Sequence, residues 1–356
     1  MEKKYRVVVA GMGKRGMHHA AAFQANGGFE VVGICDIDQA RLDAAAAKLG
    51  VAVKGTDAAQ VARDLKPDVF CFCTMANVRT PLIRIGIESG ARLIAMEKPV
   101  ALTSAVGFEV KRLVESSGVK VVVSHQHRYG SHYRAVKDVI ASGALGRIHT
   151  VYGTASGWMM HMISHLIDYM RWYNGEAAAE WVMAQAAGRG KMADAHPSPD
   201  YIGGFIQFAN GVRGIVECGA GAPDVPEVDY WWRKCRIGAQ GTDGYAEVLT
   251  GGGWRAVTKN GVQSGEGCMN YDLDMPPYIQ QMADWLDDDA RVHECNFDSA
   301  YQGLEIMMAL CRSVAGRGQV ALPLTAGADE LEMLRTSLPE QKVLLSNPMN
   351  AKEYLS

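Results

Sequence analysis

Residues 5–16 read Tyr-Arg-Val-Val-Val-Ala-Gly-Met-Gly-Lys-Arg-Gly, and this segment is the most informative about the fold of the first part of the chain. Its first half is apolar and rich in β-branched residues, a composition typical of a buried strand. Gly11, Gly13 and Gly16 then form a G-x-G-x-x-G motif, and a pattern typical of a helix continues to about residue 26. A glycine loop between a strand and a helix favours dinucleotide binding, because the helix N-terminus offers N–H donors to a pyrophosphate. The alternative is a glycine turn with a purely structural role.

An acidic residue follows this motif at the spacing that dinucleotide binding requires. Asp36 ends the next apolar run, twenty residues after Gly16, where its carboxylate would accept hydrogen bonds from the ribose hydroxyls. A carboxylate there repels a 2′-phosphate, so we expect NAD rather than NADP, although Arg41 is a nearby cation that would weaken this preference. The loop residues that we expect to contact the cofactor are Gly11, Met12, Gly13, Lys14, Arg15 and Gly16.

Apolar runs and helical patterns alternate up to residue 124. The further apolar runs lie at about 29–35, 68–73, 92–96 and 119–124, and the helical patterns between them lie at about 38–49, 81–90 and 104–116. This alternation predicts a parallel sheet with right-handed crossovers. The near-continuous apolar strands agree with it, because helices cover both faces of such a sheet.

The second part of the chain has a different pattern. Runs with strand character lie at about 148–155, 181–187, 203–209, 212–218, 231–237, 245–249 and 254–258, with one helical pattern at 161–172 among them. Adjacent strands of this kind predict a mostly antiparallel sheet. We therefore predict an α/β chain with a dinucleotide-binding domain at 1–124 and an α+β domain at 125–356.

The composition is that of an ordinary globular protein. Of the 356 residues, 48% are hydrophobic and 21% are charged, and the formal net charge of −3 argues against a protein that binds nucleic acid. We find neither about 18 consecutive apolar residues nor a signal-peptide pattern, so we expect no membrane span and a cytoplasmic location. The eight cysteines are scattered without a C-x-x-C pair, which favours free buried thiols over disulfides or zinc.

Glu97 and Lys98 follow the apolar run at 92–96 and precede Pro99. Ligands bind at the carboxyl ends of the strands in parallel sheets, so a lysine at this place could donate a hydrogen bond to a substrate oxygen. Partial burial would also lower the pKa of the lysine and allow it to carry a proton. Its position alone leaves a surface lysine paired with Glu97 equally open.

These motifs, taken in order, resemble those of the Gfo/Idh/MocA oxidoreductases. The agreement covers nearly the whole chain and rests on the glycine motif, Asp36, Glu97-Lys98-Pro99, an H-x-x-D pattern at 165–168 and the stretch 316–323. The resemblance implies an N-terminal Rossmann domain, a C-terminal domain with a large open antiparallel sheet, a nicotinamide cofactor and a carbohydrate or cyclitol substrate. It also implies homo-oligomers assembled through that sheet, a helix at 299–316 that packs back on the Rossmann domain, and a catalytic contact of Lys98 with the substrate.

A second dense group of polar residues lies on the helix predicted in the second domain. His161, His165 and Asp168 are spaced i, i+4 and i+7, so they share one face of the helix. By the resemblance, His165 corresponds to the general acid/base that takes the hydroxyl proton, whereas His161 stands where the family has aspartate. We expect the two histidines to form a coupled pair that shares one proton, with His165 as the base. The alternatives are a pair of packed core histidines and a zinc site that His125 and His127 would complete.

Further candidates follow from the resemblance and from their place at the predicted domain junction. The expected substrate contacts are Arg128, Tyr129, Asp168, Trp158 and His127. The cofactor contacts expected outside the glycine motif and Asp36 are Thr74, Met75, Asn77, Glu97, Lys98 and Gln126, and we expect no metal. Met75 and Arg79 depart from the family's pattern. Trp158 and the aromatic run 230–232 would stack on a sugar face or an aromatic aglycone, or pack in the core or at a subunit interface.

Three functions remain open at the level of the sequence. The favoured one is an NAD-dependent oxidoreductase that acts on a secondary hydroxyl of a sugar, glycoside or cyclitol, with C3 of a pyranose glycoside preferred by analogy and a 3-keto sugar as the product. The second is a redox-neutral glycosidase that holds NAD tightly, oxidises C3 transiently and eliminates the aglycone. The third is a non-catalytic nucleotide-binding regulator, because fold alone does not establish activity; the presence of Lys98 and His165 argues against it.

Overall fold

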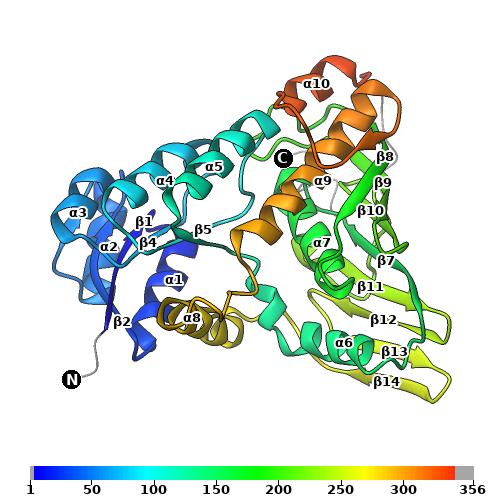
Figure 1. Cartoon of the computed structure of the whole chain (residues 1–356), viewed down its shortest axis with the longest axis horizontal. Coiled ribbons are helices and arrows are strands. Elements are labelled where there is room, and N and C mark those ends of the chain that lie inside the picture. The colour runs from blue at the N-terminus through cyan, green and yellow to red at the C-terminus, as the bar shows by residue number, and fades with distance from the viewer. Residues whose placement is uncertain (1–3, 341–356) are drawn as a thin grey trace. The chain divides into compact units, whose positions relative to one another are not determined.

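The computed structural model describes residues 4–340, which divide into two compact units (Figure 1). The first unit comprises the described residues up to 101 together with 106–129 and 270–300, and the second comprises 102–105, 130–269 and the described residues from 301 on. The sequence placed a single border at 124/125. The structure differs from that border mainly in the segment 270–300, which returns to the first unit after the chain has built most of the second.

A six-stranded parallel sheet, with the strand order β3-β2-β1-β4-β5-β6, forms the centre of the first unit. Its strands are β1 (Tyr5–Ala10), β2 (Phe29–Cys35), β3 (Lys54–Gly55), β4 (Val69–Phe72), β5 (Leu93–Met96) and β6 (Lys120–Val123). The helices that follow the strands are α1 (Lys14–Ala25), α2 (Gln39–Leu49), α3 (Ala58–Leu65), α4 (Arg79–Glu88) and α5 (Ser104–Ser117). The predicted parallel sheet is confirmed. Its order reverses between β1 and β4, which is where ligands bind in open sheets of this kind.

The core of the first unit explains why the segment 270–300 belongs to it. Helix α8 (Tyr271–Asp287) carries Tyr278, Ile279 and Met282 on one side, and all three lie in the same buried cluster as Val9 of β1 and Phe23 of α1. These three side chains are fully buried. Because burial of an aliphatic or aromatic side chain contributes about 1.5–3 kcal/mol, this helix is an integral part of the first unit's core.

A nine-stranded sheet forms the second unit, with the order β14-β13-β12-β11-β7-β10-β9-β8-β15. Its strands are β7 (Ile148–Ala155), β8 (Ala179–Ala187), β9 (Tyr201–Phe208), β10 (Arg213–Cys218), β11 (Cys235–Gly241), β12 (Gly244–Leu249), β13 (Trp254–Thr258), β14 (Gly261–Gly265) and β15 (Val320–Ala321). Neighbouring strands are antiparallel except β7 and β10, which are parallel. The predicted mostly antiparallel sheet is confirmed.

Helix α7 (Met159–Tyr173) lies against this sheet and carries the predicted histidine group (Figure 1). Two glycines of the sheet allow its close approach, because a Cβ atom on Gly153 or Gly214 would lie about 3.1 Å from the side chain of Met170. The other helices of the second unit are α6 (Ser131–Ala141), α10 (Glu330–Ser337) and most of α9 (Phe297–Gly316). The expectation that α9 packs back on the Rossmann domain stays a prediction.

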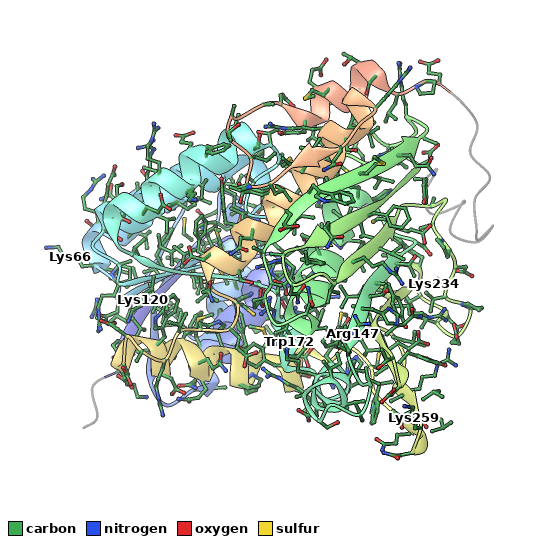
Figure 2. All side chains as sticks on the ribbon, turned by 45° about the vertical axis from the view of Figure 1, so that its right-hand side comes forward. Lys66, Lys120, Arg147, Trp172, Lys234 and Lys259 are labelled. Carbon is green, nitrogen blue, oxygen red and sulfur yellow. The ribbon has the colours of Figure 1, made fainter. Side chains whose placement is uncertain are left out.

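Two differences from the predicted strands bear on the later argument. The run at 231–237 begins with a short 3-10 helix, η3 (Trp231–Arg233), and only its second half continues as strand β11. Strand β14 was missed because its sequence, Gly-Val-Gln-Ser-Gly, is polar and exposed at the edge of the sheet. It pairs with β13 through a short turn that contains Lys259 (Figure 2). Among residues 4–340, no helix is long and apolar enough to span a membrane.

Candidate active site

The glycine loop of the first unit has the geometry that a pyrophosphate requires. Gly11 has a φ of +86°, and a Cβ atom at this position would lie 2.6 Å from the carbonyl oxygen of Cys73. A Cβ atom on Gly16 would lie 1.8 Å from the carbonyl oxygen of Gly11, so only glycine permits the helix to begin this close to the strand. Gly13, at the N-cap of α1, faces open space, because a Cβ atom there would meet nothing within 4 Å. The loop is therefore closed on its inner side and open where a phosphate would approach.

Asp36 is buried at the end of β2 and holds the glycine loop in place. Its Oδ2 accepts a hydrogen bond from the N–H of Met12 at 2.6 Å, and its Oδ1 accepts one from the N–H of Asp38 at 2.9 Å. The guanidinium of Arg41 lies 3.4 Å from both carboxylate oxygens. Each carboxylate oxygen can accept a further hydrogen bond, so the arrangement fits the ribose of NAD. Arg41 lies where it would soften the repulsion of a 2′-phosphate.

Glu97 is the centre of a buried ionic group at the end of β5. Its Oε1 lies 3.0 Å from Nε of Arg15 and 3.3 Å from Nε2 of His19, and Arg15 also lies over the ring of Tyr271 at 4.0 Å. Burial alone would raise the pKa of Glu97, but the charge of Arg15 and the hydrogen bond from His19 outweigh it and hold the pKa well below its usual range. Glu97 is therefore ionised at neutral pH and ties the start of α1 to the end of β5.

Lys98 is partly exposed, next to this group. Burial lowers the pKa of Lys98 to about 8, and the cations Arg15 and Arg79 act in the same direction, whereas Glu97 opposes them. A lysine with a pKa of about 8 is half protonated slightly above neutral pH. It can therefore both donate a hydrogen bond as the ammonium and give up a proton as the reaction proceeds.

Arg79 lies fully buried beneath the loop that carries Lys98. Its guanidinium donates to the carbonyl oxygen of Thr74 at 2.9 Å, to that of Pro99 at 3.2 Å and to that of Lys98 at 3.3 Å. Burial lowers the pKa of Arg79 to about 10, so the side chain is still charged at neutral pH. One buried cation thus fixes the loops after β4 and β5 relative to each other. Met75 and Asn77, two of the predicted cofactor contacts, are exposed at the same end of β4.

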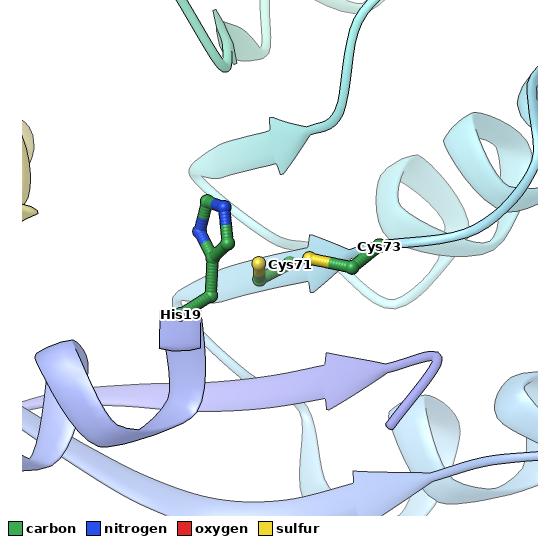
Figure 3. A group of neighbouring side chains, drawn as sticks. All are labelled: His19, Cys71 and Cys73. Atoms are coloured by element: carbon green, nitrogen blue, oxygen red, sulfur yellow. The ribbon is translucent and has the colours of Figure 1, made fainter. Parts of the chain in front are cut away.

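His19 was not among the residues predicted from the sequence. It is fully buried on α1, three residues after Gly16, and lies beside the two thiols of Cys71 and Cys73 (Figure 3). One ligand-type atom from each of these three residues lies within 4.8 Å of the others. A zinc ion would require thiolates, but the contact with Cys71, together with burial, raises the pKa of Cys73 well above its usual range. The neutral thiol and the use of His19 by Glu97 indicate packing beneath the glycine loop rather than a metal site.

The four predicted site residues that follow β6, Gln126 to Tyr129, are all buried. They form the 3-10 helix η2 (Gln126–Tyr129) and contact the segment 270–300 of the same unit. Nδ1 of His127 lies 2.9 Å from Oδ2 of Asp274, and the hydroxyl of Tyr129 donates to Gln281 at 2.5 Å. Arg128 donates to the carbonyl oxygen of Glu294 and to Ser299. These contacts position η2, and the substrate and cofactor roles of its residues stay predictions.

The histidines of α7 are partly exposed, whereas Asp168 is buried. Nδ1 of His165 lies 3.1 Å from the hydroxyl of Tyr169, and the two rings are stacked. The ring of His161 contacts His196 at a centroid distance of 5.0 Å. The expected coupling of His161 with His165 stays a prediction, and each histidine has in addition an aromatic partner that the sequence did not suggest. The hydroxyl of Tyr169 thus fixes the orientation of the His165 ring, and the role of His165 as the base stays a prediction.

Comparisons with known proteins identify the family to which the chain belongs. Residues 5–125 match the model described as the oxidoreductase family with an NAD-binding Rossmann fold, and residues 152–247 match the GFO/IDH/MocA C-terminal domain. The chain is 25% identical over 225 residues to inositol 2-dehydrogenase of Rhizobium meliloti, a match that covers 59% of this chain and 67% of that protein. It is 24% identical to D-glucoside 3-dehydrogenase of Escherichia coli over 151 residues, which cover 42% of this chain and 43% of that protein.

Among solved structures, levoglucosan dehydrogenase in complex with NADH and levoglucosan superposes with a TM-score of 0.75 at 19% identity, and the match covers 90% of this chain and all of that one. At this identity the likeness shows the fold alone. The two family models, in contrast, match both units of the chain in the expected order. The chain therefore belongs to the Gfo/Idh/MocA family of oxidoreductases and carries that family's NAD-binding Rossmann fold at residues 5–125.

Proposed function

We propose that this protein is an NAD-dependent dehydrogenase that oxidises a secondary hydroxyl of a sugar, glycoside or cyclitol, with C3 of a pyranose glycoside as the favoured position and a 3-keto sugar as the product. The observation that carries the proposal is the pKa of Lys98, lowered to about 8 at the carboxyl end of β5. Groups whose pKa lies near the working pH are typical of acid–base sites. The named activities of the inositol and glucoside dehydrogenases support the substrate class.

The proposed roles of the residues follow from their chemistry. NAD, when bound, accepts the hydride from the carbon that carries the reacting hydroxyl. Lys98 donates a hydrogen bond to the hydroxyl oxygen and stabilises the negative charge that develops on it. His165 accepts the hydroxyl proton at Nε2 while Tyr169 holds Nδ1, so one proton and one hydride leave the substrate and a ketone remains. Asp36 and the glycine loop bind the ribose and the pyrophosphate.

The test is the formation of NADH by the purified protein with a panel of cyclitols, free sugars and glycosides. Growth of NADH absorbance with a glycoside, and a ketone at C3 in the ¹³C NMR spectrum of the product, is the expected result. A product oxidised at another carbon would overturn the assignment of the reaction to C3. The absence of NADH formation with every member of the panel would overturn the dehydrogenase proposal. Released aglycone without net NADH would instead establish the redox-neutral glycosidase.

We also propose that the protein is a cytoplasmic homo-oligomer assembled through the sheet of the second unit. Met183 of β8 and Phe205 of β9 are paired across the sheet and are 48% and 55% exposed, and Ile215 of β10 continues the row. Large exposed apolar side chains in one row are typical of an interface. The eight free cysteines, six of which are buried, suit a reducing compartment. Light scattering of Phe205→Glu against the unchanged protein tests the interface, and an unchanged mass would contradict it.

A further inference from the structure

An aromatic cluster surrounds the N-terminus of α7, beside His161. Trp158 is the N-cap of the helix, and its ring contacts Trp231 of η3 at 4.9 Å with the planes at 72°. His196 lies nearly parallel to Trp158, with the ring centroids 6.4 Å apart and the planes at 23°. The same His196 ring meets His161 at 5.0 Å and 67°. Three segments far apart in the sequence thus place their rings together. We call Trp158, Trp231 and His196 the aromatic wall.

The loop at 188–200, which carries His196, is held firmly in place. The N–H of Met159, the first residue of α7, donates to Oγ of Ser198 at 2.9 Å, so the loop supplies the cap that Trp158 cannot. Ser198 is fully buried and pairs with Lys191 across the loop, and Asp194 accepts from the N–H of His196 at 3.0 Å. A loop with a built-in helix cap orients His196 before any ligand arrives, which reduces the entropy lost on binding.

The approach of Trp231 also depends on one glycine. A Cβ atom on Gly157 would lie 2.5 Å from Cγ of Met162 and 3.3 Å from the ring of Trp231. A side chain at residue 157 would therefore collide with Met162 and crowd the ring of Trp231. Trp158, Trp231 and His196 are all partly exposed rather than buried, so part of each side chain is accessible to a ligand.

We propose that the aromatic wall binds the second ring of a glycoside, the aglycone that lies next to the reacting sugar. This inference rests on the proposed function and names its substrate class more closely. The ring of Trp231 stands at 72° to that of Trp158, whereas the ring of His196 is nearly parallel to it, and the three rings together offer a larger aromatic surface than a single indole. The ammonium of Lys191 lies 5.9 Å from the Trp158 ring, and the carboxylate of Asp194 lies beside His196, so charged groups that suit a hydroxyl-bearing aglycone border the wall.

The experiment compares phenyl β-D-glucopyranoside with methyl β-D-glucopyranoside, which differ only in the aglycone. For the unchanged protein we expect kcat/KM to be about two- to tenfold higher for the phenyl glycoside, since the contact of one aromatic ring contributes about that factor. In Trp158→Ala and His196→Ala the ratio of kcat/KM for the phenyl glycoside to kcat/KM for the methyl glycoside should fall toward one. The cause should be a higher KM for the phenyl glycoside, with kcat within about threefold of the original. The matched control variants are Trp254→Ala on β13 and His149→Ala on β7, which should keep the preference.

A binding measurement separates this inference from the function on which it rests. Calorimetric titration of phenyl β-D-glucopyranoside into the protein saturated with NADH requires no turnover. If Trp158→Phe still binds the phenyl glycoside and Trp158→Ala does not, the proposed role of the aromatic wall is supported. This holds even if no glycoside is oxidised and the proposed function fails. Equal affinity for the two glycosides, or equal loss in the Trp254→Ala control, overturns the wall, even if both glycosides are oxidised. Unchanged NADH affinity in every variant shows that the variants are folded.

Discussion

Replacement of Lys98 by methionine should abolish activity and at the same time stabilise the protein. Folding lowers the pKa of Lys98 from 10.5 to about 8, mainly through burial, so the folded state disfavours the ammonium form. A lowered lysine pKa means that the unfolded chain binds more protons between pH 8 and 10.5, and stability rises with pH across that window. Below pH 8 the penalty is fully present. Methionine has a similar length and carries no charge, so it removes the penalty.

The magnitude follows from the shift. A shift of about 2.5 pH units corresponds to about 3 kcal/mol at pH 7, which is an upper limit. Lys98 is partly exposed and solvent screens its charge, so we expect a gain of about 1–2 kcal/mol in the free energy of unfolding. At pH 9.5 the increase in the free energy of unfolding should be about half as large, because Lys98 is then already mostly neutral in the folded protein.

Urea unfolding of both proteins at pH 7 and at pH 9.5 measures this difference, with NADH formation as the activity assay. Lys111→Met on α5 is the matched control, because Lys111 is 41% exposed, lies 3.6 Å from Glu115 and should give no gain. Two results would refute the reasoning. One is a loss of stability in Lys98→Met at pH 7, and the other is a gain of equal size at both pH values. Retained turnover in Lys98→Met would separately refute its catalytic role.

Three further predictions concern the residues around it. Asp36→Ala removes the acceptor of two backbone N–H groups, so NAD should bind about tenfold or more weakly and the discrimination against NADP should decrease. Cofactor titrations measure both affinities, and unchanged selectivity would contradict the role assigned to Asp36. Arg79→Met removes a cation that lowers the pKa of Lys98, so the midpoint of the pH–rate profile should rise, whereas Arg79→Lys should keep the midpoint and lose kcat. Tyr169→Phe should lower kcat several-fold with NAD affinity unchanged, and a kcat equal to the original would show that the hydroxyl does not orient His165.

The sequence predicted those parts of the fold and site that depend on local patterns. The glycine motif and Asp36 are separated by one helix and one strand, and the structure brings the carboxylate to the N–H of Met12 as that spacing requires. Five of the six strands of the parallel sheet followed from the alternation of strands and helices. Strand β3 was missed because two residues are too few to form a pattern.

Contacts between distant segments could not be predicted in the same way. Helix α8 shows an ordinary apolar stripe, and nothing in its own sequence tells which of two cores it joins. The structure places Tyr278 with Val9, more than 250 residues away in the chain. Arg79 stood out only as a departure from a family pattern, and its partners are backbone carbonyl oxygens, which leave no trace in the sequence. His196 lies in an irregular loop without periodicity, so its approach to His161 had no signal at all.

The group at the end of β5 combines several charges whose burial costs free energy. Arg15, Arg79 and Lys98 are three cations around one carboxylate, Glu97, and burial disfavours the charge of each of them. A core built for stability alone would not contain this excess of positive charge, because burial of each cation costs free energy that one carboxylate does not offset for all three. This excess helps to lower the pKa of Lys98 to about 8, and in the proposed mechanism the same positive field would stabilise a developing alkoxide. The instability of this group and its proposed reactivity thus have the same electrostatic origin, and the Lys98→Met variant should separate them.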